Sequence, residues 1–525
     1  MLSRSAFREI AKPTTMEKLM GWFSPGLAVK RRRARVTMAV SGGYTGASKT
    51  RRSLKSYTPG GQDADADLLP DLETLRERSR DMVRNMPLAA GVINTKVTNV
   101  VGTGIKLHAR IDRAALNMSD AGADVWETNT EREWRLFWNS QEVDAARTQN
   151  GDALSAMVYR QAKENGDVFV LLPRITRKNS VYNLTLQVIE ADRVCNENNA
   201  QDTDTLAAGI RKDTYGAPLE YQILSAHPGG LAYTGGTWQK IPAFGARLGL
   251  RNILHLYKPT RPGQTRGVPD LAAVIEPLKQ LTRYTEAELM AAVVSGMFTV
   301  FVENELGDPT FDLDDTATET GATTSDDDYK LANGAIIGLA PGEKIHDTNP
   351  GRPNAAFDPF TLAILRQIGV AVEIPFEILV KHFTSSYSAA RAALLEAWKY
   401  FMVERKWLTD NFHQVIYEIW MYEAVTAGRI AAPGFLADPA VRQAYLSAEW
   451  VGPTKGQIDE LKEVNAAKKR ADMGVTTLAE ETAAMTGGDW EKKHPQSVKE
   501  YEARKKAGLI VEKEPPGFAP NNQGA

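Results

Sequence analysis

At 525 residues the chain is long enough for about two to four domains and a substantial buried core. Its hydrophobic content of 43% is ordinary for a soluble protein, and no window approaches about eighteen uninterrupted apolar residues, so we expect no membrane partner. The net charge of −2 argues against tight gripping of duplex DNA, which needs an excess of Lys and Arg over the binding domain. The single cysteine, Cys195, excludes an intramolecular disulfide and a cysteine-clustered zinc site.

Residues 1–65 have the composition of a flexible basic arm, in which basic runs alternate with Gly and Ser. A docking arm or a nucleic-acid tether is the alternative interpretation. Within the arm, Gly43 to Thr50 approaches the phosphate-binding loop G-x-x-x-x-G-K-[ST], with Ser48 where the second glycine belongs. Pro59-Gly60-Gly61 leaves little room for the helix whose N-terminus should hold the anion, so this site is only weakly indicated.

The next part of the chain predicts helices followed by strands, which is typical of an α+β domain. Helices are predicted over residues 71–85, 88–101, 126–138 and 153–165, and strands over 105–109, 168–172, 184–189, 219–223 and 253–257. In the first helix the arginines at 76, 78, 80 and 84 are interpreted as a solvated face or as partners of Glu73 and Glu77. His255 lies inside an apolar strand and is interpreted as a core histidine, and Cys195 as a structural thiol.

A long helix is predicted over residues 271–297, bent or interrupted early by Pro277. Its surface becomes small and apolar towards its end, which implies packing against several helices. Strands at 298–303 and 335–339 flank an acidic stretch, which we interpret as a solvated loop. Helices are predicted over 360–372 and over 388–401, where Ser388 is a plausible N-cap, with the polar loop 381–387 between them. Further helices follow at 407–427, 453–473 and 477–485, and the end of the chain has a disordered composition.

Catalytic signatures are missing from this pattern. The seven histidines form no zinc motif, no G-x-S-x-G elbow is present, and no G-x-G-x-x-G follows a strand. A chain of this length without such a signature favours an architectural role, and we expect no catalytic residues, no metal and no cofactor.

Six segments carry a family pattern when they are taken in order: Leu75–Arg80 with Arg84–Pro87, Asn99–Ile105, Ile189–Val194, Arg261–Pro269, Tyr284–Leu289 and Ser385–Leu395. Together they resemble the portal proteins of tailed bacteriophages, specifically the lambda-type portal family. The resemblance covers about residues 66 to 485 and leaves the arm and the tail outside it.

The resemblance implies an α+β phage portal fold with wing, stem, clip and crown, assembled as a ring of about twelve identical subunits around an axial channel. The implied division is a basic arm (1–65), a wing (66–268), a stem helix (269–297), a clip (298–346), a second stem helix with its return (347–379), a tunnel loop and tunnel helix (380–405), helices that complete the wing and form the crown (406–490), and a largely disordered tail (491–525).

The implied function is that of a channel at one capsid vertex through which double-stranded DNA is packaged and ejected, without sequence specificity and without enzymatic activity. Such a ring nucleates capsid assembly and docks the terminase large subunit, then head-completion or adaptor proteins. Its other partners are the major capsid and scaffold proteins, and its location is the virion, with the host cytoplasm during assembly. The alternatives are a head–tail adaptor and, resting only on Gly43 to Thr50, a nucleotide-dependent DNA translocase.

Three groups of residues are the implied sites. The channel group is Lys381, His382, Phe383, Thr384, Ser385, Ser386, Tyr387 and Arg391, which would touch the DNA backbone without reading bases. The stem-packing group is Ala287, Ala291, Ala292 and Gly296. The clip-rim group is Asp312, Asp314, Asp315, Asp326, Asp327 and Asp328.

Overall fold

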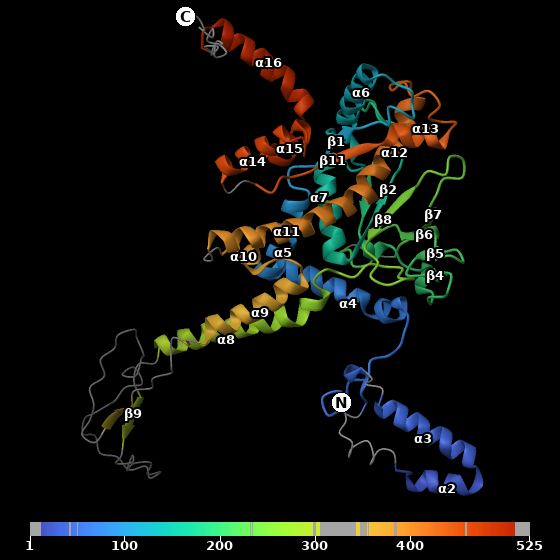
Figure 1. Ribbon diagram of the computed structural model, residues 1–525, viewed down its shortest axis with the longest axis vertical. Helices are drawn as coiled ribbons and strands as arrows, with labels where there is room; N and C mark the ends of the chain where they lie inside the picture. The colour runs from blue at the N-terminus through green and yellow to red at the C-terminus, as the bar shows by residue number, and fades with distance from the viewer. Residues whose placement is uncertain are drawn as a thin grey trace, which may run out of the picture. The chain divides into compact units, whose positions relative to one another are not determined.

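The computed structural model describes residues 12–40, 44–49, 51–231, 233, 235–297, 301–304, 343–346, 354, 356–382, 386–456 and 459–509. The chain divides into two units, Met1–Asp63 and Ala64–Ala525. Figure 1 shows the elements of both. The implied clip-rim aspartates and the predicted strand 335–339 lie outside the described residues.

The first unit contains two helices, α2 (Thr15–Phe23) and α3 (Pro25–Val40), and a short turn of 3-10 helix, η1 (Thr45–Ala47). The hydroxyl of Thr14 accepts a hydrogen bond from the backbone N–H of Glu17, and the Glu17 carboxylate accepts one from the N–H of Thr14. This reciprocal capping begins α2. The pattern of the basic arm does not predict these helices. Ser and Pro count there as interruptions, but Ser24 and Pro25 stand at the end of α2 and the start of α3, and Pro is favoured at a helix start.

The second unit opens with four helices, α4 (Ala64–Asn85), α5 (Pro87–Val100), α6 (Asp120–Trp138) and α7 (Gly151–Asn165). All four helices predicted here are confirmed, but α4 and α6 begin earlier than expected. The start of α6 is set by Ser119, whose hydroxyl accepts a hydrogen bond from the N–H of Gly122 at 3.3 Å. In α4, Asp65 and Asp67 lie in the first turn, where the helix dipole favours acidic residues.

Two antiparallel sheets follow, as the α+β prediction requires. Strand β2 (Asp167–Leu171) is the centre of a three-stranded sheet between β3 (Gln187–Ile189) and β8 (Ile253–Tyr257). In its register with β8, Phe169 lies opposite His255. The four-stranded sheet has the order β4 (Leu206–Ala207), β5 (Ile210–Lys212), β6 (Pro218–Leu224) and β7 (Trp238–Pro242).

The main core lies where helices far apart in the sequence meet around tryptophan side chains. Trp134 of α6 stacks on Trp138 with ring centroids 4.9 Å apart, and it meets Trp420 of α12 (Gln414–Thr426) edge to face at 5.2 Å. Trp450 closes the cluster from β11 (Ala448–Val451), which pairs with β1 (Lys106–Ala109). Aromatic side chains bury large areas, so this cluster fixes the C-terminal helices against the first helices of the unit.

A pair of helices leaves this body side by side, as Figure 1 shows: α8 (Ile275–Met297), which follows the turn η5 (Ala272–Val274), and α9 (Phe357–Ala371). The predicted helix is interrupted early, as expected: the turn η5 ends at Val274 and α8 begins at Ile275, with Pro277 in its first turn, where the missing N–H costs nothing. Tyr284 of α8 packs on Phe357 and Phe360 of α9, with centroids 5.6 and 5.2 Å apart. Beyond this pair, β9 (Phe301–Asn304) pairs antiparallel with β10 (Glu343–His346).

A long helical segment returns through the body. After the short helix α10 (Phe376–Leu379), helix α11 (Tyr387–Leu408) continues through one turn of π-helix, η6 (Thr409–His413), into α12. The predicted N-cap Ser388 is wrong: the hydroxyl of Ser386 accepts from the N–H of Ala389, so helix α11 includes two more residues. The predicted end near residue 401 is also wrong, because no glycine or proline interrupts the chain there.

Four more helices follow within the described residues up to 509: α13 (Pro439–Leu446), α14 (Glu460–Asp472), α15 (Leu478–Thr486) and α16 (Trp490–Lys506). The expected disorder from residue 491 is therefore wrong as far as residue 506. Asp489 begins α16 by accepting a hydrogen bond from the N–H of Glu491. Within the described part of the chain, no helix is long and apolar enough to span a bilayer.

Candidate functional site

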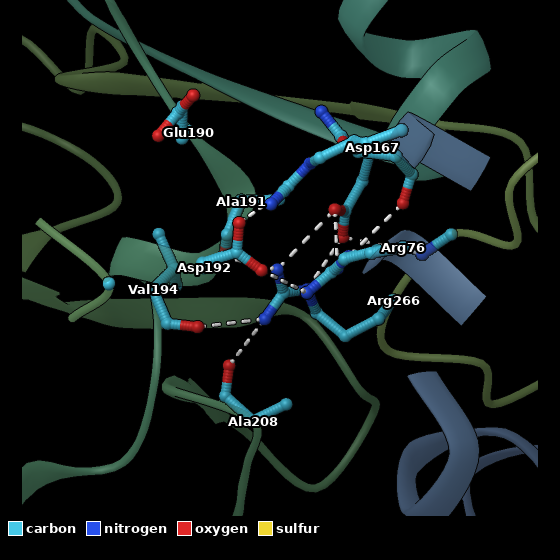
Figure 2. A network of polar contacts seen from close by, with 12 residues as sticks. Arg76, Asp167, Glu190, Ala191, Asp192, Val194, Ala208 and Arg266 are labelled. Carbon is cyan, nitrogen blue, oxygen red and sulfur yellow. Dashed lines mark hydrogen bonds and ion pairs between the residues drawn. The ribbon is translucent and has the colours of Figure 1, made fainter. Parts of the chain in front are cut away.

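The segment that joins β8 to the root of α8 is held by a buried arginine. Arg266 is 1% exposed, and its guanidinium donates from Nε to Oδ2 of Asp167 at 2.6 Å. Its remaining N–H groups donate to the carbonyl oxygens of Val194, Ala208 and Ala191 at 2.9, 3.0 and 2.8 Å. Figure 2 shows this side chain reaching Ala191 and Val194 on one segment and Ala208 on another. The planar guanidinium thus fixes the chain just before α8 leaves the body.

Asp167, the first residue of β2, is the centre of this network and is fully buried. It also accepts a hydrogen bond from Arg76 of α4 at 2.7 Å, and His255 lies 3.2 Å away. Burial alone would raise the pKa of the Asp167 carboxyl, but Arg266 and Arg76, with His255, hold it well below its ordinary value. The carboxylate therefore stays ionised, and the root of α8, helix α4 and the central strand are joined through one charged group.

A second acceptor, Asp192, extends the network to the next turn of α4. Arg80 donates to its carboxylate, and Arg76 lies 4.0 Å from it. The interpretation of the α4 arginines as a solvated face is wrong for Arg76 and Arg80, while Arg84 is exposed as expected. Burial lowers the pKa of Arg76 to about 10, yet the group remains charged at neutral pH.

Two glycines let the backbone close around this network. A Cβ placed on Gly267 would lie 2.0 Å from the carbonyl oxygen of Gly166, and Gly166 has a positive φ of 90°. No side chain fits between these two backbone segments. Gly267 is thus required where the chain turns from the sheet towards α8.

A second network connects the root of α8 to α11 through alternating charges. Asp270 lies 2.7 Å from Lys96 of α5 and 3.5 Å from Lys163 of α7. Lys163 lies 2.8 Å from Glu404 of α11, and Glu404 also accepts from Lys258, at the end of β8. Burial would raise the pKa of Glu404, but Lys163 and Lys258 lower it to about 2. The five groups form one continuous chain of opposite charges.

Cys195 and His255 have structural surroundings in the described part of the chain. Burial raises the pKa of the Cys195 thiol, so the thiolate is disfavoured and the interpretation of a structural thiol agrees with the structure. His255 stacks between Phe169 and Tyr257, with centroids 4.2 and 4.3 Å away, which confirms a core histidine. No group of three or more His, Cys, Asp or Glu side chains in the described ranges could hold a metal ion.

The near-match to a phosphate-binding loop lacks the required surroundings. Helix α3 precedes it where a strand is needed, and the described residues 51–63 that follow it contain no helix. Gly43 and Thr50 lie outside the described residues. Without a helix N-terminus there is no dipole to hold a phosphate.

The residues implied for the channel occupy the turn before α11 and its first two turns. Lys381 and His382 are exposed, and Lys381 has a left-handed φ of 54°. Ser386 caps α11 and Tyr387 is its first residue, whereas Phe383, Thr384 and Ser385 lie outside the described residues. Arg391 lies 3.9 Å from Glu463, so its side chain is directed towards α14. That these residues face DNA stays a prediction.

The residues implied for stem packing lie on α8. Ala287 and Ala292 are exposed in the single subunit and Ala291 is half-buried, while Gly296 lies in the last turn, where side-chain burial is not described. Their packing against neighbouring subunits also stays a prediction.

Comparison with known proteins identifies the family. The profile described as "Phage portal protein, lambda family" matches residues 50–405. The chain belongs to the lambda family of phage portal proteins. It is similar to portal protein B of Escherichia phage lambda, with 26% identity over 508 residues that cover 91% of this chain and 92% of the relative.

A second curated relative and one solved structure were also found to be similar to this chain. The portal protein of Escherichia phage N15 is 26% identical over 486 residues, which cover 89% of this chain and 90% of that one. A chain from the neck of an empty gene transfer agent particle, computed with C6 symmetry, is 12% identical, covers 83% of this portal chain and 99% of its own length, and has a TM-score of 0.43.

The portal match includes both buried networks but not the C-terminal helices α13 to α16. Analysis of the sequence found Arg266 and Asp192 as parts of family segments but missed Asp167, Lys163 and Glu404. One available signal was the spacing of Arg76 and Arg80, which places two cations one turn apart beside the apolar face of α4. Nothing local in the sequence marks the carboxylates that they meet, since the partners lie 91 and 112 residues away.

Proposed function

We propose that this portal protein assembles as a ring of about twelve identical subunits at one capsid vertex and forms the channel for double-stranded DNA during packaging and ejection. Membership of the lambda portal family supports this function. In this proposal α8 and α9 are the stem, the segment between them is the clip, and α11 with the loop before it lines the tunnel. The segments from residue 406 to 490, which include α14 and α15, complete the wing and form the crown.

The observation that carries ring assembly is the exposed apolar surface of α8. Leu289, Met290 and Val293 are 66%, 62% and 44% exposed although α8 already packs on α9. Burying each of these side chains against an identical neighbour would contribute up to about 1.5 to 3 kcal/mol. Ala287 and Ala292 on the same exposed surface would let the backbones of neighbouring stems approach closely.

The surface of α11 suits a channel through which DNA slides. Its exposed charges occur as balanced pairs, Glu396 with Lys399 at 2.7 Å and Lys406 with Asp410 at 2.8 Å. Each uncompensated lysine on a phosphate would add affinity and salt dependence, and strong binding would oppose translocation. Lys381 and His382 would contact the backbone in passing, without base readout.

The proposed partners follow from this position in the particle. The clip would dock the terminase large subunit, which hydrolyses ATP, and later the head-completion or adaptor proteins. The wing would contact the major capsid and scaffold proteins in the host cytoplasm during assembly. The portal subunit itself would have no enzymatic activity.

The decisive experiment is the mass of the purified full-length protein in solution, with negative-stain images of the same sample. A closed ring of about a dozen subunits with a central hole supports the proposal. A stable monomer that does not assemble with scaffold protein present contradicts it. A small oligomer without a closed ring would favour a head–tail adaptor.

A further inference from the structure

A cavity of about 980 Å³ lies beside the alternating charge network. Helix α11 forms one wall, the turn between α9 and α10 forms another, and the floor comes from α5, α7 and the segment after β8. All five members of the network, Lys96, Asp270, Lys163, Glu404 and Lys258, line this cavity. The cavity is therefore bounded by charged groups that the fold already holds in place.

The network carries one positive charge that its own members do not balance. It contains three ammonium groups and two carboxylates, and each carboxylate is shared between two lysines. Arg366, Lys399, Glu373 and Glu396 also line the cavity and add two positive and two negative charges. The lining as a whole therefore carries one excess positive charge.

Burial makes this excess costly. The side chain of Lys96 is 2% exposed and that of Lys163 is 6% exposed. Burial lowers the pKa of Lys96, and Asp270, its closest partner, only partly opposes this. A buried ammonium that shares its counter-ion is stabilised when an anion enters the same space, because the Coulomb attraction is strong away from water.

The outer end of the network is open to a ligand. Lys258 has a side chain that is 36% exposed, and one of its three ammonium donors is directed to Glu404. Val370, Val403 and Phe376 also line the cavity and provide apolar walls. A small anion next to Lys258 would meet a cation beside these apolar side chains, whereas a metal cation would meet the excess positive charge of the lining.

We propose that this cavity binds a single oxyanion, a phosphate or a carboxylate group, against Lys258 at the open end of the network. The bound anion completes the alternation of charges and strengthens the connection between the root of α8 and α11. Two sources share this chemistry: free phosphate in solution, and a side-chain carboxylate of a second copy of this chain. The second source rests on the proposed ring, whereas the site itself does not.

The test is calorimetric titration of inorganic phosphate into the full-length protein in a phosphate-free buffer of constant ionic strength. We expect saturable binding of one phosphate per chain. Lys258→Met should weaken it at least tenfold. The matched control, Lys399→Met, removes a lysine of the same cavity whose side chain is 74% exposed and should change the affinity less than twofold.

A second measurement applies if a variant folds poorly. Phosphate should raise the melting temperature of the unaltered protein above that in chloride of equal ionic strength, because a ligand that binds only the folded state stabilises it. The absence of both saturable binding and a shift overturns the proposal, as does unchanged affinity in folded Lys258→Met.

Titration of separate subunits and of assembled rings distinguishes the sources. If separate subunits bind phosphate and assembled rings do not, a carboxylate of the neighbouring copy occupies the site in the ring. If both forms bind phosphate, the site takes a free anion. Particle mass is measured independently, so failure to form rings and failure to bind phosphate are distinct results.

Discussion

Replacing Asp167 with asparagine tests whether the root of α8 depends on the buried carboxylate. The substitution preserves shape but removes the negative charge that faces Arg76 and Arg266. Arg266 and Arg76 now donate to the two carboxylate oxygens at 2.6 and 2.7 Å. In asparagine one of these oxygens is replaced by an N–H₂ group, which cannot accept from either arginine. Both guanidinium groups then remain in a site where the side chain of residue 167 is 0% exposed.

The expected magnitude follows from removing one partner of a buried ion pair. Such a loss costs about 3 to 5 kcal/mol in the free energy of unfolding, because the remaining charge is left without compensation. The carbonyl acceptors of Arg266 are unchanged, so the lower part of this range is expected. The measurement is urea unfolding of the full-length protein at fixed concentration, followed by tryptophan fluorescence.

The stabilisation by the Asp167 carboxylate should depend on pH in one direction only. The pKa of Asp167 is depressed in the folded state, so its stabilisation is complete above the ordinary carboxyl pKa and is lost as the pH falls through the folded value. The difference between the original protein and Asp167→Asn should thus be constant from neutral pH down to about 5 and shrink only in stronger acid.

A surface carboxylate is the matched control. Asp410 pairs with Lys406 at 2.8 Å, and both side chains are more than half exposed. Asp410→Asn should change the free energy of unfolding by less than about 1 kcal/mol. If Asp167→Asn costs no more than this control, the reasoning that the network holds the root of α8 is refuted.

Two further substitutions and one deletion test separate parts of the structure. Ala292→Trp should leave the far-ultraviolet circular dichroism of the subunit unchanged, because the position is exposed, but should block ring formation measured by particle mass; normal rings would remove α8 from the stem interface. Gly267→Ala should destabilise the subunit by about 1 to 3 kcal/mol in urea unfolding, because its methyl group would lie 2.0 Å from the Gly166 carbonyl oxygen. Gly245→Ala, whose added methyl group meets nothing closer than 3.6 Å, is the control and should be nearly neutral. Deleting residues 381–385, while keeping the serine that caps α11, should preserve particle mass and reduce the DNA packaged or retained in a packaging assay; unchanged packaging would exclude this loop from the mechanism.

The local signals in the sequence identified most elements of the body. The apolar period of about 3.6 residues located α5 and α7, and the apolar strand ending at Tyr257 was identified with its bounds. These signals work because burial of one face repeats at every turn. They fail at the start of α4, where Pro70 lies inside the helix, and throughout α16, which has no buried residue and therefore no apolar period.

The family, the α+β class and a buried His255 were determined by the sequence alone. The charged partners of Arg76, Arg266, Lys163 and Glu404 were decided only by the tertiary structure. An amphipathic pattern shows which face of a helix is buried, but a long cation at the edge of that face can reach either water or a carboxylate. Because those carboxylates come from a strand, turns and a helix distant in the sequence, the fold itself selects between the two and thereby positions α8 against the body.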